Sequence, residues 1–570
     1  GCILSVDYLV VSVEERHVND DSYTSQGSSW RYRAAIGLVA VVVVLAIAAR
    51  RGKGPGGAGP DQPAGPKADD EAAELERQLS AVLDGLRPER LGVSVDAEGL
   101  VDGMNLWWAD YSQLEEVDIP ALEMDSVRAA YGDAAFKYAS GRRFDTRDMA
   151  HVRNCQMYRA IAEYIAETSE DDVGRALTAY RWVVDNVELS PGSSAGPPVT
   201  PFEVLLLGRG RPEDRAWLLA EIMRKLGSDC VLVSPADDES ADDTSAGLVG
   251  VIGSAGDVYL FDVKLGLAIP SAAATPDAWQ IDRPATLSEV RADPSLLRQL
   301  DVEDGEAYPL TNEQLTDVRV QFVSQSEFSA TRMAGLQEAL PAQYAMSLVD
   351  PLTVAEEGTP GLLDRVRMAG SEGRWSEDVV EAWLYPEQRT TAFHEAGAED
   401  AEELSQTMRR MAGPRVKRTE LVDDTRRFVD VIGNSDRPLR YVRVQQMRGE
   451  LSEALVGYGQ IRSAASFVTE AVNDETKEYS VYWIAVCQRD LGRYESCLGT
   501  LRVYLKDYPS GVWSRAAQRL QAVCEAELGR FHEAAEILES ASEGRTPSPR
   551  NAILIQRWRA MAGDVPEPTP

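Results

Sequence analysis

The chain has 570 residues and a formal net charge of −34, from 92 acidic and 58 basic residues. Its length predicts roughly three or four domains, and its hydrophobic fraction of 44% is that of a globular protein. So large a negative charge argues against nucleic acid as a ligand, because the phosphates would be repelled.

The first predicted element is a membrane-spanning helix. Residues 1–33 are polar, and we expect a disordered tail there. Residues 34–49 are uncharged, with Trp30 before them and Arg50 and Arg51 after. A helix of this length spans about 24 Å, and flanking side chains can complete the ~30 Å of a bilayer core. We predict a single-pass anchor rather than a buried core helix. The flanking charges nearly balance, and we expect the soluble part to be extracytoplasmic.

A linker and a helical region follow the anchor. Residues 50–68 are rich in Gly and Pro, which is typical of a flexible linker. Residues 69–144 are predicted to be a helical region. Four apolar side chains share one stripe of its first helix: Leu75, Leu79, Val82 and Leu86. We expect the body of the protein to cover this stripe, and a partner helix is the alternative.

Helices and strands are easier to predict after Asp148. A first helix is predicted to run from Asp148 to about Glu167. Ser169 and Asp172 form an S-x-x-D capping box for a second helix. A third helix is predicted over 214–226 and ends at Gly227. Three short apolar runs then predict strands: Cys230–Ser234, Leu248–Ile252 and Val258–Phe261.

Residues 145–270 resemble the core of the transglutaminase-like superfamily, which has the papain-like α+β fold. Three segments carry the resemblance: RWVVDNVEL (181–189), the turn and helix start GRGRPEDRA (208–216), and LFDVKLG (260–266). The chain is most similar in layout to the large, membrane-anchored members from planctomycete-type bacteria, in which such segments recur beside C-terminal helical repeats.

The resemblance implies a catalytically degenerate site. The family places a nucleophilic Cys at the start of the helix and a His and an Asp on the strands that follow. Here Pro212 stands in the place of the Cys, and no histidine occurs between 154 and 392. The histidine's place falls near Ala246 and Gly247, and only Asp262 matches the third member. We therefore predict a pseudoenzyme domain.

No cofactor or metal site is predicted. His394-Glu395 and His532-Glu533 lack the second histidine of H-E-x-x-H. Asp214 and Arg215, beside Pro212, could be a charged site, but an acidic first turn of a helix is the simpler interpretation.

One cysteine leaves an enzymatic alternative open. Cys155 follows His151 by four residues, so the two side chains can share one helical face. The alternative function is a cysteine-type hydrolase or acyl transferase with a relocated nucleophile. No C-x-x-C occurs, and we expect the cysteines after Cys2 to be buried small hydrophobes.

Residues 271–438 are predicted to form a small α+β region without a catalytic signature. A strand is expected over 317–325, a helix over 329–340 and a further strand over 379–386.

The last region, 439–562, shows an internal repeat. Each copy has a Gly, a bulky apolar residue two positions later and a small residue five positions later. The signature residues are Gly449, Ala454, Gly492, Tyr494, Cys497, Pro509, Gly529, Phe531 and Ala534. The offsets resemble the tetratricopeptide repeat (TPR), in which Gly allows the tight turn between helices. The copies are 43 and 37 residues apart, longer than the expected ~34, and a helical bundle with Gly turns is the alternative.

These observations predict an α+β papain/transglutaminase-like core, a C-terminal all-α TPR-like array and one N-terminal transmembrane helix. The predicted function is a membrane-anchored scaffold whose array binds a protein or peptide partner. The alternatives are the cysteine-type enzyme named above and a purely structural envelope protein.

Overall fold

A computed structural model of the chain describes residues 67–90, 96–114, 122–169, 171–190, 199–236, 247–275, 278–302, 305, 307–354, 359–371, 373–408, 411, 415–422, 425–432, 438–465, 471–542 and 547–563. The tail predicted over 1–33 and the anchor predicted over 34–49 lie outside these residues and stay predictions. Within the described part, every helix is too short or too polar to cross a membrane.

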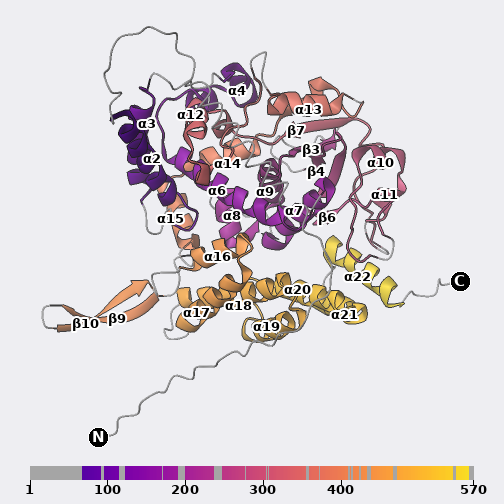
Figure 1. Cartoon of the computed structure of the whole chain (residues 1–570). Coiled ribbons are helices and arrows are strands. Elements are labelled where there is room, and N and C mark those ends of the chain that lie inside the picture. The colour runs from indigo at the N-terminus through magenta and orange to yellow at the C-terminus, as the bar shows by residue number, and fades with distance from the viewer. Residues whose placement is uncertain are drawn as a thin grey trace, which may run out of the picture. The chain divides into compact units, whose positions relative to one another are not determined.

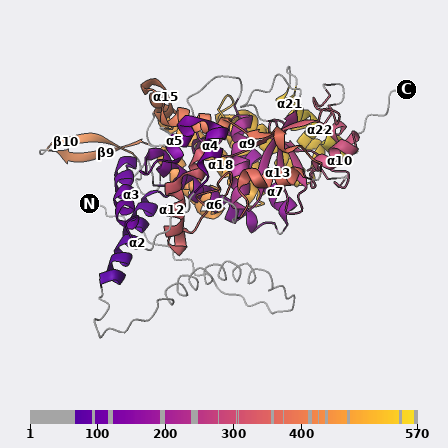
Figure 2. The ribbon, with the colours of Figure 1, turned by 90° about the horizontal axis from the view of Figure 1, so that it is seen from above.

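The described chain begins with four helices: α2 (Lys67–Gly85), α3 (Ala97–Tyr111), α4 (Met124–Tyr131) and α5 (Asp133–Ala139). α2 packs along α3, and Figure 2 shows the pair side by side. Leu79, Val82 and Leu86 are buried and join the core. The predicted apolar stripe is therefore covered by the body of the protein.

The centre of the core is α9 (Pro212–Lys225), which packs against α6 (Thr146–Ala166), α7 (Asp172–Asn186) and the first strand of the main sheet. Every residue from Asp214 to Met223 is buried, so α9 is covered on all sides. It ends as predicted at Gly227, whose φ of 84° is left-handed. There Ser228 N donates to Met223 O at 3.0 Å and Gly227 N to Arg224 O at 3.2 Å, a Schellman ending.

Two short segments connect α7 to α9. α8 (Pro201–Leu207) lies between the two-residue strands β1 (Glu188–Leu189) and β2 (Arg209–Gly210), which pair in parallel. The predicted capping box before α7 is wrong by two residues. Asp171 is the N-cap, because its carboxylate accepts from Gly174 N at 2.6 Å.

Among the described residues, the main sheet has six strands in the order β6-β5-β4-β3-β7-β8. Their bounds are β3 (Asp229–Pro235), β4 (Leu248–Ile252), β5 (Val258–Asp262), β6 (Leu267–Ala268), β7 (Val318–Phe322) and β8 (Val380–Ala382). All neighbours are antiparallel except β7 and β8. The strands predicted over 230–234, 248–252 and 258–261 are confirmed. The strand predicted over 379–386 is shorter, because α14 already begins at Tyr385.

The middle region adds helices and one hairpin. Its helices are α10 (Leu287–Ala292), α11 (Ser295–Arg298), α12 (Thr331–Ala339), α13 (Leu362–Gly370), α14 (Tyr385–His394) and α15 (Ala398–Met408). β9 (Arg415–Val422) pairs with β10 (Thr425–Ile432) in an antiparallel hairpin that the sequence analysis did not predict.

Over the C-terminal residues that the structure describes, the chain forms an array of seven helices: α16 (Leu439–Met447), α17 (Leu451–Ala465), α18 (Ala471–Asp490), α19 (Tyr494–Asp507), α20 (Ser514–Glu527), α21 (Phe531–Ala541) and α22 (Pro549–Ala562). Each helix packs against the next along the chain. Figure 1 shows the array running along one side of the α+β core. The predicted all-helical C-terminal array is confirmed.

Candidate functional site

The array is built from helix pairs joined by identical turns. Gly449, Gly492 and Gly529 follow α16, α18 and α20, with φ of 80°, 69° and 75°. In each turn the N–H after the glycine donates to a carbonyl five residues back, as in Arg493 N to Gln488 O at 2.8 Å. The small residues of the signature, Ala454, Cys497 and Ala534, are fully buried. The array is therefore a regular stack of helix-turn-helix units.

The array has two layers, and the core covers one of them. We call α16, α18, α20 and α22 the inner layer, and α17, α19 and α21 the outer layer. Hydrogen bonds, ion pairs and ring contacts join all four inner helices to the core. Solenoids of helix pairs bind partners through such extended faces, and here the chain's own core occupies one of them.

The centre of this junction is aromatic. Trp483 of α18 packs against Trp513 at 5.5 Å between ring centroids, and Tyr482 stacks on Trp513 at 4.6 Å. The core places Gly208 against them, where a Cβ would lie 2.4 Å from Trp483. Its φ is 68°, so the position requires glycine for its backbone as well as for space. A buried aromatic centre of this kind is typical of stable protein interfaces.

Arg443 of α16 connects this centre to the core backbone. Its side chain is fully buried and donates to Leu205 O at 3.0 Å and to Asn186 Oδ1 at 3.1 Å. Tyr479 of α18 likewise donates to Leu206 O, the next carbonyl of α8. The array thus satisfies carbonyls at the end of α8 that the helix itself leaves without partners.

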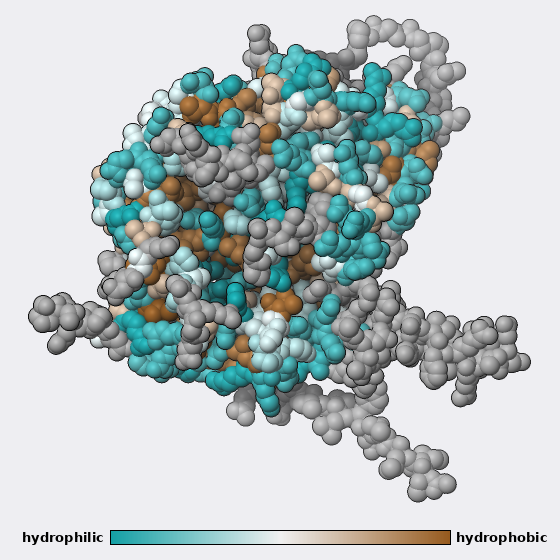
Figure 3. Space-filling view, turned by 180° about the vertical axis from the view of Figure 1, so that it is seen from behind, coloured by the Kyte–Doolittle hydropathy of each residue, from teal (hydrophilic) through white to brown (hydrophobic). Residues whose placement is uncertain are grey.

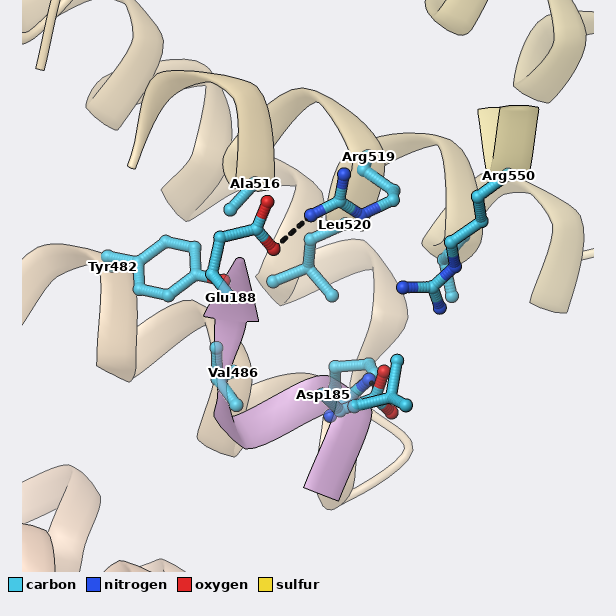
Figure 4. A pocket seen from close by; sticks show the side chains of 11 residues that line it. Asp185, Glu188, Tyr482, Val486, Ala516, Arg519, Leu520 and Arg550 are labelled. Carbon is cyan, nitrogen blue, oxygen red and sulfur yellow. Dashed lines mark hydrogen bonds and ion pairs between the residues drawn. The ribbon is translucent and has the colours of Figure 1, made fainter. Parts of the chain in front are cut away.

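Ion pairs surround the aromatic centre. Arg489 of α18 pairs with Asp185 at 2.7 Å, and Arg519 of α20 pairs with Glu188. Figure 4 shows Glu188, on β1, reaching toward Arg519, and Asp185 at the end of α7. A cavity of about 30 Å³ lies between them, beside Arg550 of α22. That is space for very few water molecules, so the junction is nearly filled.

A larger hollow separates the last inner helix from the core. It measures about 700 Å³ and lies between α22 and the loop that follows β6. Arg557 lines it and makes no hydrogen bond or ion pair to any described residue. Burial without a counter-charge lowers the pKa of Arg557. Contact between α22 and the core is made instead by Trp558 against Trp279, at 5.8 Å.

The positions predicted to correspond to a transglutaminase-like triad make structural contacts. Pro212 is the first residue of α9, where a missing N–H costs nothing. The carboxylate of Asp262 accepts from Lys264 N at 2.9 Å, from Leu265 N at 2.7 Å and from Tyr308 Oη at 2.8 Å. Its lone pairs therefore hold the turn after β5 and the segment around Tyr308.

Asp214 and Arg215 are buried in the core. Asp214 accepts from Arg211 N at 2.8 Å and from Tyr385 Oη at 2.9 Å, so it caps α9. Burial raises the pKa of Asp214. Arg215 donates to Val187 O at 2.8 Å and to Val263 O at 2.9 Å, and burial lowers its pKa to about 10. It connects α9 to the ends of α7 and β5.

The structure brings Cys155 and His151 together. Cys155 Sγ lies 3.6 Å from His151 Nε2 and 3.5 Å from Lys225 Nζ. Burial opposes both charges, but the pair and Lys225 outweigh it. The pKa of Cys155 is lowered, and that of His151 is raised to about 9. Both shifts favour the charged forms, a thiolate beside an imidazolium.

Burial keeps substrate from this pair, and the histidine is also bonded to the backbone. Cys155 is fully buried and His151 is 3% exposed. His151 Nε2 also lies 2.9 Å from Leu348 O, and because a carbonyl can only accept, Nε2 carries a proton. The proton on Nε2 is thus held by a backbone carbonyl. Among the residues described, no carboxylate hydrogen-bonds to His151 and no His/Cys/Asp/Glu cluster suits a metal.

The comparisons with known proteins agree with the array. The family model for anaphase-promoting complex, cyclosome, subunit 3 matches residues 458–541, well under half of the chain. The matched segment begins within α17 and ends with α21. No curated protein and no solved structure matches this chain. Together with the repeated turns, the match establishes TPR-like repeats, which suggest a role in protein interaction.

The residues of the junction were not predicted from the sequence. Arg443, Trp483, Arg489 and Arg519 lie on the inner layer, outside the glycine signature. An available signal was the composition of α18, on which Tyr479, Tyr482, Trp483 and Arg489 follow one another closely. Arg and Trp together are typical of interface centres.

Proposed function

We propose that this chain is a protein-interaction scaffold whose TPR-like array is mounted on its own core and binds a protein partner through the outer layer. One observation carries this proposal: the core fills the inner layer, so the outer layer is the broad face of the array left open. Figure 3 shows that the surface visible from behind is mostly hydrophilic, with apolar residues in separate small groups. Val456 on α17 and Val503 on α19 are 58% and 41% exposed.

We further propose that residues 34–49 tether the scaffold to a membrane and that residues 145–270 are an inactive transglutaminase-like domain. The supporting observation is the order of elements, with Pro212 beginning α9, the antiparallel strands β3, β4 and β5 following, and Asp262 ending β5. At Gly247, near the place of the family's histidine, a Cβ would lie 2.6 Å from Val233 O. A side chain there requires the strands to move apart.

The enzyme alternative rests on Cys155 and His151 and is weaker, because both side chains are buried away from any substrate. A thiol-reactive probe applied to the folded chain tests it. We expect Cys155 to stay unlabelled until the chain is denatured. Rapid labelling of the native protein that His151→Gln abolishes would favour the enzyme.

A capture experiment tests the scaffold. The full-length chain is the bait, beside a Val456→Asp/Val503→Asp variant. Met368→Asp is the matched control, because Met368 is an apolar side chain 61% exposed on α13 of the core. We expect the double variant to lose the captured partner while its melting temperature and the control's capture stay unchanged. Equal capture by all three baits rejects the outer layer as the binding face.

Tethering needs a separate measurement. The full chain and a variant lacking residues 34–49 are compared by membrane fractionation. We expect the full chain in the membrane fraction, resistant to high salt, and the variant in the soluble fraction. The same distribution for both would reject the tether without touching the proposal about the array.

A further inference from the structure

Two thiols meet inside the array, where α19 and α20 pack together. Cys497 Sγ on α19 lies 3.2 Å from Cys524 Sγ on α20, and both residues are fully buried. A disulfide has an S–S length of about 2.05 Å, so the two sulfur atoms need to approach by only about 1 Å. Cys487 on α18 is also buried, but it contacts no other thiol within the described residues.

We propose that Cys497 and Cys524 form a disulfide bond that links an outer-layer helix of one repeat to the inner-layer helix of the next. The two cysteines lie 27 positions apart and within the segment that the family model matches. The bond thus closes a loop containing the α19–α20 turn. It rests on the contact between these thiols and not on the proposed function.

The reaction is thiol–disulfide exchange with a small disulfide as oxidant. The thiolate of one cysteine attacks a sulfur of the oxidant, forms a mixed disulfide and releases one small thiolate. The thiolate of the second cysteine then attacks the protein sulfur of that mixed disulfide and releases the second small thiolate. Two electrons and two protons leave the protein thiols in all, and the oxidant is reduced to two thiols.

Packing controls when this exchange occurs. The hydrogen bond between the two thiols, together with burial, raises the pKa of Cys497, and only the thiolate attacks a disulfide. The closed array is therefore slow to react in either direction. The bond forms as the repeats pack during folding, and it is afterwards shielded from reductants. It requires an oxidising compartment, as the predicted extracytoplasmic location of the soluble part would supply.

Peptide mapping of the full chain tests the bond directly. The protein is unfolded, refolded with oxidised and reduced glutathione, blocked with an alkylating reagent and digested without reduction. We expect one peptide pair joining Cys497 to Cys524, about 2 Da lighter than the two reduced peptides. Cys155, Cys230 and Cys487 should be recovered alkylated. Recovery of Cys497 and Cys524 as alkylated thiols, or a link from either to Cys487, would overturn the proposal.

A stability measurement distinguishes a native bond from an accidental one. Closing a loop of this size stabilises a protein by restricting the unfolded chain. We expect the oxidised protein to melt about 3 °C or more above the reduced one. Cys497→Ala should abolish this difference, and Cys487→Ala, the matched buried control, should keep it. If Cys497→Ala fails to fold, the map of the unaltered chain still decides. An oxidised protein that melts no higher than the reduced one contradicts a native bond.

Discussion

The guanidinium of Arg443 lies on the face of Trp483, with its central carbon 3.4 Å from the ring centroid. The same guanidinium donates to the backbone of Leu205 and to the side chain of Asn186 in the core. One buried side chain from α16 is thus held by α18 on one side and by the α+β core on the other. The array and the core are joined through hydrogen bonds that water cannot replace.

The first prediction concerns Arg443→Met, which keeps an apolar stem of similar length. The carbonyl of Leu205 and the amide of Asn186 lose their donor inside the junction, and each buried polar group left without a partner costs about 1–3 kcal/mol. We expect a loss of about 3 kcal/mol in the free energy of unfolding, measured by urea denaturation. Arg502→Met, at an exposed position of α19, is the control and should change stability by less than about 0.5 kcal/mol. A loss as small as the control's would show that Arg443 does not support the junction.

The second prediction separates backbone strain from crowding at Gly208. Gly208→Ala adds a Cβ in a left-handed conformation and against Trp483. Gly227→Ala adds one at a φ of 84° with nothing within 4 Å, so it measures the backbone effect alone. We expect about 1 kcal/mol of destabilisation at Gly227 and roughly 3 kcal/mol at Gly208, the excess reflecting overpacking. Thermal unfolding of the two variants measures this difference, and equal losses would mean that Trp483 moves aside freely.

The third prediction is a pH dependence from Cys155 and His151. The stabilisation from His151 is lost as pH rises from 6.5, its ordinary pKa, through its raised value of about 9. The stabilisation from Cys155 is lost as pH falls from 9, the ordinary value, through its lowered pKa. Because each shift depends on the charge of the other group, the pair stabilises the fold most between these limits.

The measurement is the difference in unfolding free energy between the native chain and Cys155→Ala, followed from pH 5 to pH 10. We expect a maximum near neutral to mildly alkaline pH and a decline on both sides. Cys230→Ala is the control, since burial raises the pKa of that thiol and it should be neutral throughout the range. A flat difference for Cys155→Ala would show that the pair is uncharged.

The fourth prediction tests whether Asp262 is structural. Its carboxylate accepts three hydrogen bonds that hold the turn after β5 and reach Tyr308. Asp262→Ala should lower the unfolding free energy by about 2 kcal/mol, because bonds to a charged acceptor contribute about 1.5–3 kcal/mol when little exposed. Tyr308→Phe should reproduce part of that loss. Asp110→Ala, at an exposed site on α3, is the matched control. An Asp262→Ala protein as stable as the control would reopen a functional role for this residue.

Local patterns in the sequence predict much of the core. The strand at 248–252 has the bounds of β4, and the helix predicted over 214–226 is α9 with its glycine ending. These elements are encoded by neighbouring residues, namely apolar runs, a proline at the first helical position and Gly227 at the last. The β9–β10 hairpin was missed because charged and apolar residues do not alternate regularly there and no Asn-Gly or Asp-Gly marks the turn.

The surroundings of the candidate sites, in contrast, could not be predicted from the sequence. The spacing of His151 and Cys155 predicts that they meet, and they do. The other contacts of the pair were not predicted. Leu348 O binds His151 and Lys225 binds Cys155, and both come from distant parts of the chain. Likewise, the repeat signature identifies the turns of the array but not its docking, because Arg443 and Leu205 are 238 residues apart. Contacts at such separations leave no periodic trace in one sequence.

The inner layer is fixed to the core at both ends, by Arg440 donating to Pro88 O at 3.0 Å and by Trp558 against Trp279. A solenoid whose repeats contact only one another can gain or lose repeats and can change its curvature. The array of this chain cannot gain a repeat in this way. An extra helix pair inserted before α20 would shift every later inner helix by about 10 Å along the core and separate Arg519 from Glu188. The core therefore fixes the number of repeats, and the array is a rigid element of defined length.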